Sequence, residues 1–304
     1  MQISSIIPRL SSFCPHTSPP LRSLHKIANP SLAPSSSTRA YSSFRQEQNL
    51  FSSKKSDELT AKLNEIVAQH FAIHPFVNGV TQDNAKNVLK GYFAMSQAFP
   101  YLQAGAYKDI IISSILKNQP ISKEIDESFV VGTFLSFDET GGNYLLRTEG
   151  IQALPKLLNT EDLFHASLLS KDMQAIFGEN IQPNYEYPTN DYLLTLLNGL
   201  GSQDRIERCA TMVAFEMHAG QMIEALWNAL HSLYPHHAKD SLQYFQVHVG
   251  GDDPQEEYHK MLTQKMVDSA ISFEKKRVFL EAFKEKYENN FSWCATLCDV
   301  NRDK

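Results

Sequence analysis

Six residues whose side chains commonly bind metal ions stand among apolar residues between positions 139 and 259 of this chain. They are Glu139, His165, Glu216, His248, Asp252 and His259. Ionisable side chains on the buried faces of helices are costly unless they are paired or bound to a metal. Imidazoles combined with carboxylates offer mixed nitrogen and oxygen ligands to a metal ion. The sequence therefore predicts a buried metal site.

Glu216 provides the strongest case for a buried carboxylate. It lies in the apolar run ATMVAFEMHAGQMIEALW, where Met212, Val213 and Gly220 share its helical face at spacings of three and four residues. A structural glutamate bonded to a buried Arg or Tyr is the alternative. His218 lies about 200° around the helix from Glu216, so we expect a hydrogen-bonded core histidine there rather than a second ligand of the same metal.

The third group of candidate ligands follows in HVGGDDPQEEYH, where Asp252 and His259 come four and eleven residues after His248. These three residues share a narrow arc of one helical face if the helix resumes in phase after the intervening glycine pair. Asp253 is also a good N-cap for the next helix, and Glu256 precedes His259 by almost one turn. Asp252 is our preferred acidic ligand, with Glu256 and Asp253 as open alternatives.

Helical apolar spacing dominates the chain from Ser56 onward, and strand-like alternation is scarce. This pattern predicts one all-α domain over residues 56–300, a multi-helix bundle whose ligands project inward. Helices are expected at about 56–74, 81–118 with a kink or break at Pro100, 122–140, 160–177, 189–199, 204–234, 238–249 and 254–287, the last being continuous or broken near 271, and a loop or short helical insertion is expected at about 143–159.

The N-terminal segment has a different composition. Its first 45 residues are rich in serine and proline, carry basic residues such as Arg9 and Arg39, and contain no Asp or Glu. This composition is typical of a transit peptide. We predict a mitochondrial transit peptide at 1–41, with processing near Ser42, and a linker at 42–55. A plastid peptide and an untargeted disordered tail are the alternatives.

Composition excludes some classes of function. The chain has 304 residues, 42% of them hydrophobic and 20% charged, which is ordinary for a soluble globular protein. No apolar run approaches the roughly 18 residues that a membrane-spanning helix needs. Removal of residues 1–41 would leave 24 of the 28 Lys and Arg residues against 34 Asp and Glu residues. Such an acidic chain is a poor partner for nucleic acid.

The candidate ligands resemble those of the heme-oxygenase-like diiron oxidases and oxygenases. In that family one core helix supplies a Glu and a His, a second supplies a Glu, and a third supplies a His-x3-Asp-x2-His run. By position, Glu139 in FDETGG and His165 in LFHASLL match the first pair, and Glu216 in AFEMHA matches the second contribution. The run from His248 to His259 matches the third.

The resemblance covers about residues 57–286, with two departures in spacing. The family keeps its first Glu and His close together, whereas 25 residues separate Glu139 from His165 here. The run that ends at His259 is longer by about one helical turn. The helix that supplies Glu139 and His165 must therefore be interrupted and resumed. The longer run before His259 also leaves undecided which acidic residue is the ligand.

The resemblance implies two Fe(II) ions, or iron with manganese, bridged by Glu216, with O2 as cosubstrate. It further implies a small amine- or carboxylate-bearing substrate and a homodimer. One alternative is a metal-independent enzyme of the same fold, similar to thiaminase II and the PQQ-synthesis proteins. Another is a noncatalytic helical scaffold, in which loss of His165 or His259 would leave stability unchanged or increased.

Overall fold

The computed structural model describes residues 58–237, 239–250 and 255–300. These residues form helices and no strand, which confirms the prediction of an all-α bundle. No helix among them is long and apolar enough to cross a membrane. The predicted transit peptide, the linker and Asp252 lie outside the described residues.

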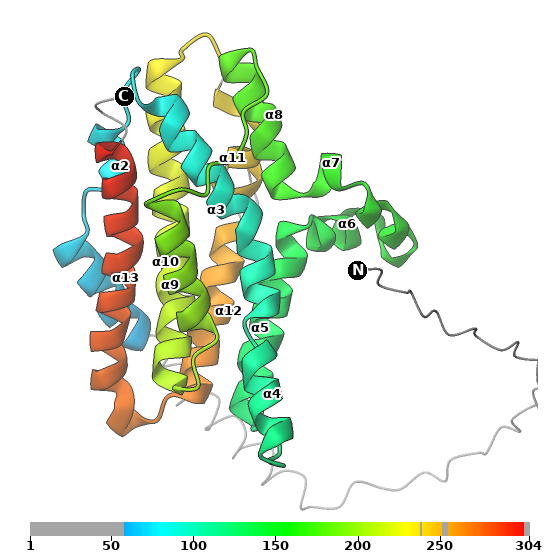
Figure 1. Cartoon of the computed structure of the whole chain (residues 1–304), viewed down its shortest axis with the longest axis vertical. Helices are drawn as coiled ribbons and strands as arrows, with labels where there is room; N and C mark the ends of the chain where they lie inside the picture. The colour runs from blue at the N-terminus through cyan, green and yellow to red at the C-terminus, as the bar shows by residue number, and fades with distance from the viewer. Residues whose placement is uncertain (1–57, 238, 251–254, 301–304) are drawn as a thin grey trace, which may run out of the picture. The chain divides into compact units, whose positions relative to one another are not determined.

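Figure 1 shows the helices in chain order. After a helical segment at 58–70, they are α2 (Pro75–Gly79), α3 (Ala85–Gly105), α4 (Lys108–Leu116), α5 (Lys123–Glu139), α6 (Gly142–Glu149), α7 (Thr160–Leu163), α8 (His165–Phe177), α9 (Thr189–Leu200), α10 (Arg205–Leu233), α11 (Gln243–Val249), α12 (Gln255–Ala270) and α13 (Lys276–Asp299). Short 3-10 helices are η1 (Ile151–Leu158), η2 (Lys239–Ser241) and η3 (Phe273–Lys275).

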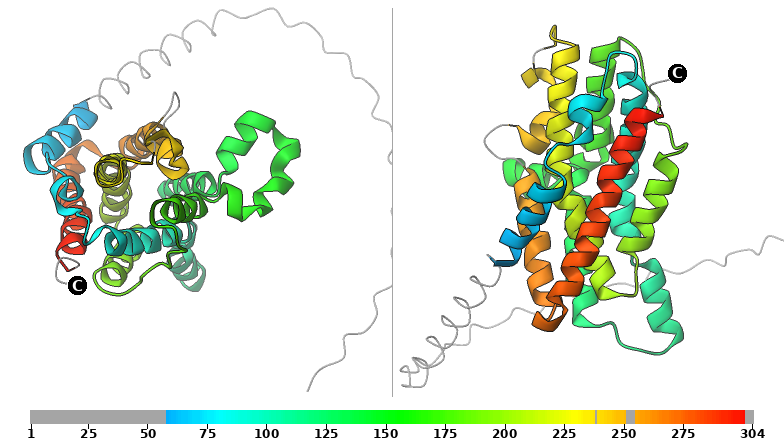
Figure 2. Two further views of the ribbon diagram at one scale, coloured as in Figure 1. Left: turned by 90° about the horizontal axis from the view of Figure 1, so that it is seen from above. Right: turned by 90° about the vertical axis from the view of Figure 1, so that its left-hand side faces the viewer.

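The long helix α10 forms the centre of the bundle. Its residues are buried around most of its circumference from Arg208 to Leu230, because it contacts α2, α9, α11, α12 and α13 on different sides. Helix α5 packs against α3 and α12, and α8 packs against α3 and α11. Figure 2 shows the bundle from above and from the side. Helices α5, α8, α10, α11 and α12 thus enclose one region of the core.

Between α5 and α8 the chain leaves the bundle and returns. Helices α6 and α7 and the 3-10 helix η1 form this excursion, which projects to the right in Figure 1. Gly141 begins it in the left-handed region, with φ 77°, and a Cβ atom there would lie 2.6 Å from the backbone oxygen of Leu163. The excursion therefore starts and ends at neighbouring points of the bundle.

Several helices begin or end at residues other than those predicted. The helix expected from Thr160 onward breaks at Phe164, whose backbone is extended, so His165 is the first residue of α8. The helix expected from 238 begins only at Gln243, as α11. Helix α13 runs on to Asp299, well past the expected end near 287. Helix α3 continues through Pro100 and ends at Gly105.

Helices α11 and α12 do not form the single in-phase helix that would align His248, Asp252 and His259. The extended backbone of Gly250, with ψ 174°, ends α11. His248 and His259 therefore belong to separate helices. Their relative placement depends on packing rather than on helical periodicity.

Candidate metal centre

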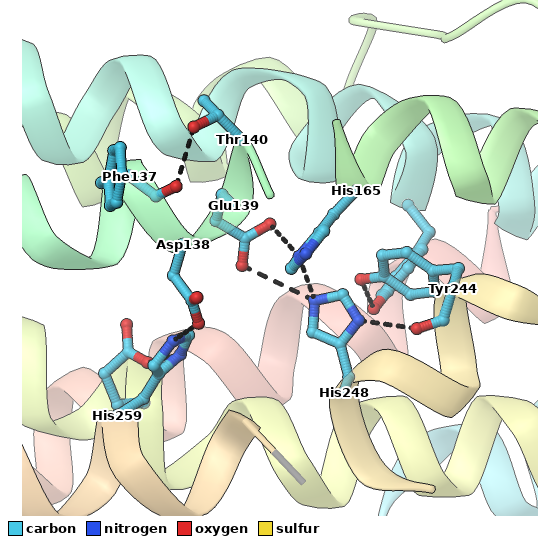
Figure 3. Close-up of polar contacts among 10 residues, drawn as sticks. Phe137, Asp138, Glu139, Thr140, His165, Tyr244, His248 and His259 are labelled. Atoms are coloured by element: carbon cyan, nitrogen blue, oxygen red, sulfur yellow. Dashed lines mark hydrogen bonds and ion pairs between the residues drawn. The ribbon is translucent and has the colours of Figure 1, made fainter. Parts of the chain in front are cut away.

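The first group of candidate ligands comprises Glu139, His165 and His248, which come from α5, α8 and α11. Nδ1 of His165 lies 3.3 Å from Oε2 of Glu139, and Nε2 of His248 lies 3.6 Å from Oε1 of the same carboxylate. These two ring nitrogens are 3.2 Å apart. Figure 3 shows both imidazoles turned toward Glu139. All three side chains are buried, so this donor cluster is shielded from solvent.

The second group comprises Glu216 on α10 with Glu256 and His259 on the first turns of α12. Nδ1 of His259 lies 3.2 Å from Oε2 of Glu216, and one ligand atom of each residue lies within 4.8 Å of the others. Oε1 of Glu216 and Oε2 of Glu256 are buried and have no hydrogen-bond partner within the part of the chain that the structure describes. Buried oxygens of this kind are costly, and a cation would satisfy both.

The two groups share one small cavity. Its volume is about 20 Å³, enough for an occupant of roughly the size of a water molecule. The polar part of its lining includes Glu139 and His248 from the first group and all three residues of the second. The apolar part consists of Met95, Phe99, Phe215, Ala219, Met222 and Ile223. Two donor clusters that meet at one cavity form a single centre.

The electrostatics of the two groups differ. Burial acts to raise the pKa of Glu139, but the neighbouring His165 and His248 outweigh burial and lower that pKa. In the second group burial prevails: it raises the pKa of Glu216 against the opposing effect of His259, and it raises the pKa of Glu256 to about 7. The second group therefore lacks enough positive charge to keep both carboxylates ionised, and a divalent cation would supply it.

Hydrogen bonds fix which nitrogen of two histidines faces the centre. Nε2–H of His259 donates to Oδ2 of Asp138 over 2.7 Å, which leaves Nδ1 toward Glu216. Nδ1–H of His248 donates to the backbone oxygen of Tyr244 over 2.7 Å, which leaves Nε2 toward Glu139. Partners of this kind orient the ligating histidines of metal sites. Figure 3 shows both contacts.

Asp172 holds the short helix that carries His248. Its Oδ1 and Oδ2 accept hydrogen bonds from the backbone N–H groups of Gln243 and Tyr244, each over 2.9 Å. These groups open α11 and have no partner within the helix. Asp172 lies on α8, the helix that begins at His165. One carboxylate therefore ties together the two helices that supply the first group's imidazoles.

Asp138→Ala is expected to weaken metal binding by the second group about 10- to 100-fold, because the ring of His259 loses the acceptor that orients it. Competition with a chromophoric chelator measures the affinity. Asp126→Ala is the matched control, since Asp126 is exposed at the other end of α5. Equal affinities of wild type and Asp138→Ala would show that Asp138 does not support the site.

The structure brings five of the six predicted ligands together, namely Glu139, His165, Glu216, His248 and His259. Asp252, the preferred acidic ligand, lies outside the described residues, whereas Glu256, an open alternative, is part of the second group.

Asp138 was not among the residues predicted from the sequence to lie at the site. Its helical register could have revealed it, because Asp138 follows the buried Val131 and Leu135 by seven and three residues on one face of α5.

Comparison with known proteins gives a fold but no family. No family model and no curated protein matches the chain. Two crystal structures, at 2.00 and 1.35 Å resolution, of a CADD-like protein of unknown function from Nostoc punctiforme PCC 73102 are similar to it. The TM-scores are 0.59 and 0.57, at 15% sequence identity. The chain shares this fold. The matches cover 82% of this chain and 99% and 96% of those chains.

A third buried group, His74, His218 and Cys294, also has metal-binding side chains. Nδ1 of His74 accepts a hydrogen bond from the backbone N–H of Phe76 over 3.2 Å. The ring proton of neutral His74 is therefore on Nε2, which donates to Nε2 of His218 over 3.1 Å. Because these bonds use the lone pairs that a metal would need, we interpret the two rings as a hydrogen-bonded core pair. This agrees with the role expected for His218.

His74 is expected to make stability depend on pH. Burial lowers its pKa to about 3 in the folded protein. In the unfolded chain His74 has an ordinary histidine pKa near 6.5. As the pH falls, His74 therefore takes up a proton in the unfolded chain at a higher pH than in the folded protein. This residue's contribution to stability is complete above pH 6.5 and decreases below it, by about 1.4 kcal/mol per pH unit down to about pH 3.

The test compares wild type with His74→Asn, because Asn keeps an acceptor for the Phe76 N–H as an N-cap. Denaturant unfolding of both metal-free proteins at pH 6.5, 5.5 and 4.5 gives their free energies. The wild-type value is expected to fall about 1.4 kcal/mol more per pH unit. Parallel pH profiles would show that this imidazole is not held neutral by burial.

Proposed function

We propose that this protein is a nonheme diiron oxidase or oxygenase that uses O2 as cosubstrate. The observation that carries the proposal is the meeting of two buried donor groups, Glu139 with two histidines and Glu216 with Glu256 and His259, at one cavity. The ligand pattern resembles that of the heme-oxygenase-like diiron family, and the fold shared with the CADD-like protein supports the same assignment.

The donor set fits iron. Three imidazoles and three carboxylates, with no thiolate in either group, favour Fe(II) or Mn(II) over soft ions such as Cu(I). Four carboxylates lie at or beside the centre, namely Glu139, Glu216, Glu256 and Asp138. When ionised, their four negative charges balance the charge of two divalent cations. In the proposal Glu139, His165 and His248 would hold one ion, and Glu216, Glu256 and His259 would hold the other.

When bound by these residues, a pair of iron ions would supply electrons for the reduction of O2. The chain's own residues prepare the site for that chemistry. Asp138 and the backbone oxygen of Tyr244 fix the imidazoles of His259 and His248, so little reorganisation is needed. Apolar side chains such as Phe99 and Phe215 exclude bulk water from the cavity.

A hydroxyl pair also lines this cavity. The hydroxyl oxygens of Tyr92 and Tyr244 are 2.8 Å apart. Burial raises the pKa of both phenols far above neutrality. The pair therefore keeps its protons at neutral pH and holds a hydroxyl proton beside the centre.

Anaerobic loading of the purified protein with Fe(II), followed by elemental analysis and Mössbauer spectroscopy, tests the proposal. The expected result is about two irons per chain, with spectra that change on exposure to O2. Failure to bind iron would overturn the proposal and favour a metal-independent enzyme or a scaffold. Iron that binds but does not respond to O2 would overturn the assignment as an oxidase or oxygenase.

A further inference from the structure

A second, larger pocket lies beside His165 of the first donor group. Its volume is about 290 Å³, and the excursion contributes one wall of it through Gly141, Tyr144 and Leu163. Gln243 and Gln246 of α11 form another wall, and Gln255 at the start of α12 also contributes. Because His165 lines this pocket and its Nδ1 faces Glu139, a molecule in the pocket lies beside a proposed metal ligand.

The polar lining of this pocket includes two carboxylates and three carboxamides, and the carboxamides offer acceptor oxygens as well as donor N–H groups. Oε1 of Gln255 is buried and has no hydrogen-bond partner among the described residues, and the whole residue is only 3% exposed. A buried acceptor without a donor is costly, and an N–H group of a ligand would satisfy it. Gln255 directly precedes Glu256 of the second donor group, so this acceptor is close in sequence to the centre.

The charged residues at the pocket are acidic. None of the described residues that line it is Lys or Arg. Asp162 is already engaged, since its oxygens accept hydrogen bonds from Lys171 and Asn159. Asp240, exposed at the pocket, accepts a hydrogen bond from Gln246 over 3.3 Å and has no ion pair with a described residue. The carboxylate of Asp240 has no cationic partner among the described residues, and together with the carboxamide oxygens it favours a cation that donates hydrogen bonds.

We infer that this acceptor pocket binds the ammonium group of the substrate, so the enzyme acts on an amine-bearing rather than a carboxylate-bearing small molecule. The inference rests on the proposed function for the chemistry that follows binding. The proposed centre is compatible with it, because the four carboxylates at or beside it offset two divalent cations and leave no excess positive charge to repel an ammonium group.

The test uses n-butylammonium and butyrate, which have the same chain length and opposite charge. Their binding to the full chain, loaded anaerobically with Fe(II), is measured by calorimetry and by the shift of the thermal unfolding temperature. The ammonium probe is expected to bind at least about tenfold more tightly than butyrate. Equal affinities, tighter binding of butyrate, or no binding of either probe would overturn the inference.

Three variants locate the binding. Gln255→Met keeps the size of the side chain but removes its acceptor, and it is expected to weaken n-butylammonium binding about tenfold. Asp240→Asn removes an exposed charge and is expected to weaken binding about threefold. Asp162→Asn is the matched control, with affinity within about twofold of wild type because its carboxylate is already paired. Unchanged affinity in the first two variants would place the amine elsewhere and overturn the inference.

Iron content of the same samples separates the two proposals. Two irons per chain without selective amine binding would leave the diiron assignment standing and remove the pocket assignment. Selective amine binding that depends on Gln255, in a protein that takes up no iron, would keep the pocket and remove the diiron chemistry.

Discussion

Replacing Glu256 by alanine is expected to lower the iron content of the anaerobically loaded protein from about two ions per chain to about one. Glu256 lies in the second donor group with an unpartnered carboxylate oxygen. Without it, that group retains only Glu216 and His259, which are too few ligands to hold an ion firmly. Asp252→Ala is expected to leave the iron content at about two, which elemental analysis measures.

A matched control for this result is Glu257→Ala, which removes an exposed carboxylate one position further along α12. Its iron content is expected to equal that of wild type. If Asp252→Ala lost an iron and Glu256→Ala kept both, the acidic ligand would be the residue that the sequence favoured, and the second group would need redefinition.

Removal of the metal is expected to destabilise the protein strongly. The centre gathers three carboxylates and three imidazoles with exposed fractions of 6% or less. Without metal cations, bound protons must compensate the negative charge of the carboxylates. The raised pKa values of Glu256 and His259 show this, because both groups hold their protons more strongly than usual. At a free metal concentration about 1,000 times the dissociation constant, one bound ion adds about 4 kcal/mol to the free energy of unfolding.

Denaturant unfolding in the presence of Fe(II) or of a chelator, under anaerobic conditions, measures this difference. Glu216→Ala is expected to lose most of the stabilisation by metal, because the resemblance to the diiron family implies that Glu216 bridges the ions. A noncatalytic scaffold makes the opposite prediction: metal would not change stability, and His165→Ala or His259→Ala would be neutral or stabilising.

Much of the fold follows from local apolar periodicity. Helix α10 was predictable from its sequence, because Glu216 shares a face with Met212, Val213 and Gly220 and all four are buried in the structure. The ends of α5 and α9 were predictable to within one residue from Ser122 and Thr189 at their starts and from the glycines near their C-terminal ends. These features depend only on neighbours within a few residues.

What could not be predicted depends on contacts between distant segments. The start of α11 at Gln243 is set by the carboxylate of Asp172, about 70 positions earlier in the chain. The sequence left the acidic ligand open among Asp252, Asp253 and Glu256, because periodicity gives the face of a helix and not the direction of the next one. The extended backbone of Gly250, which ends α11, is not visible in that periodicity. The break at Phe164, after which His165 faces Glu139, likewise depends on tertiary contacts.

The close approach of Gly141 to the backbone of Leu163 has an evolutionary consequence. Because residues 142–162 leave and re-enter the bundle at neighbouring points, insertions or deletions among them need not move Glu139 or His165. Closing a longer loop between fixed ends costs little, about 0.6 kcal/mol for each doubling of its length. Selection can therefore reshape the wall of the acceptor pocket, and with it the substrate preference of the proposed enzyme, while the candidate metal ligands keep their geometry.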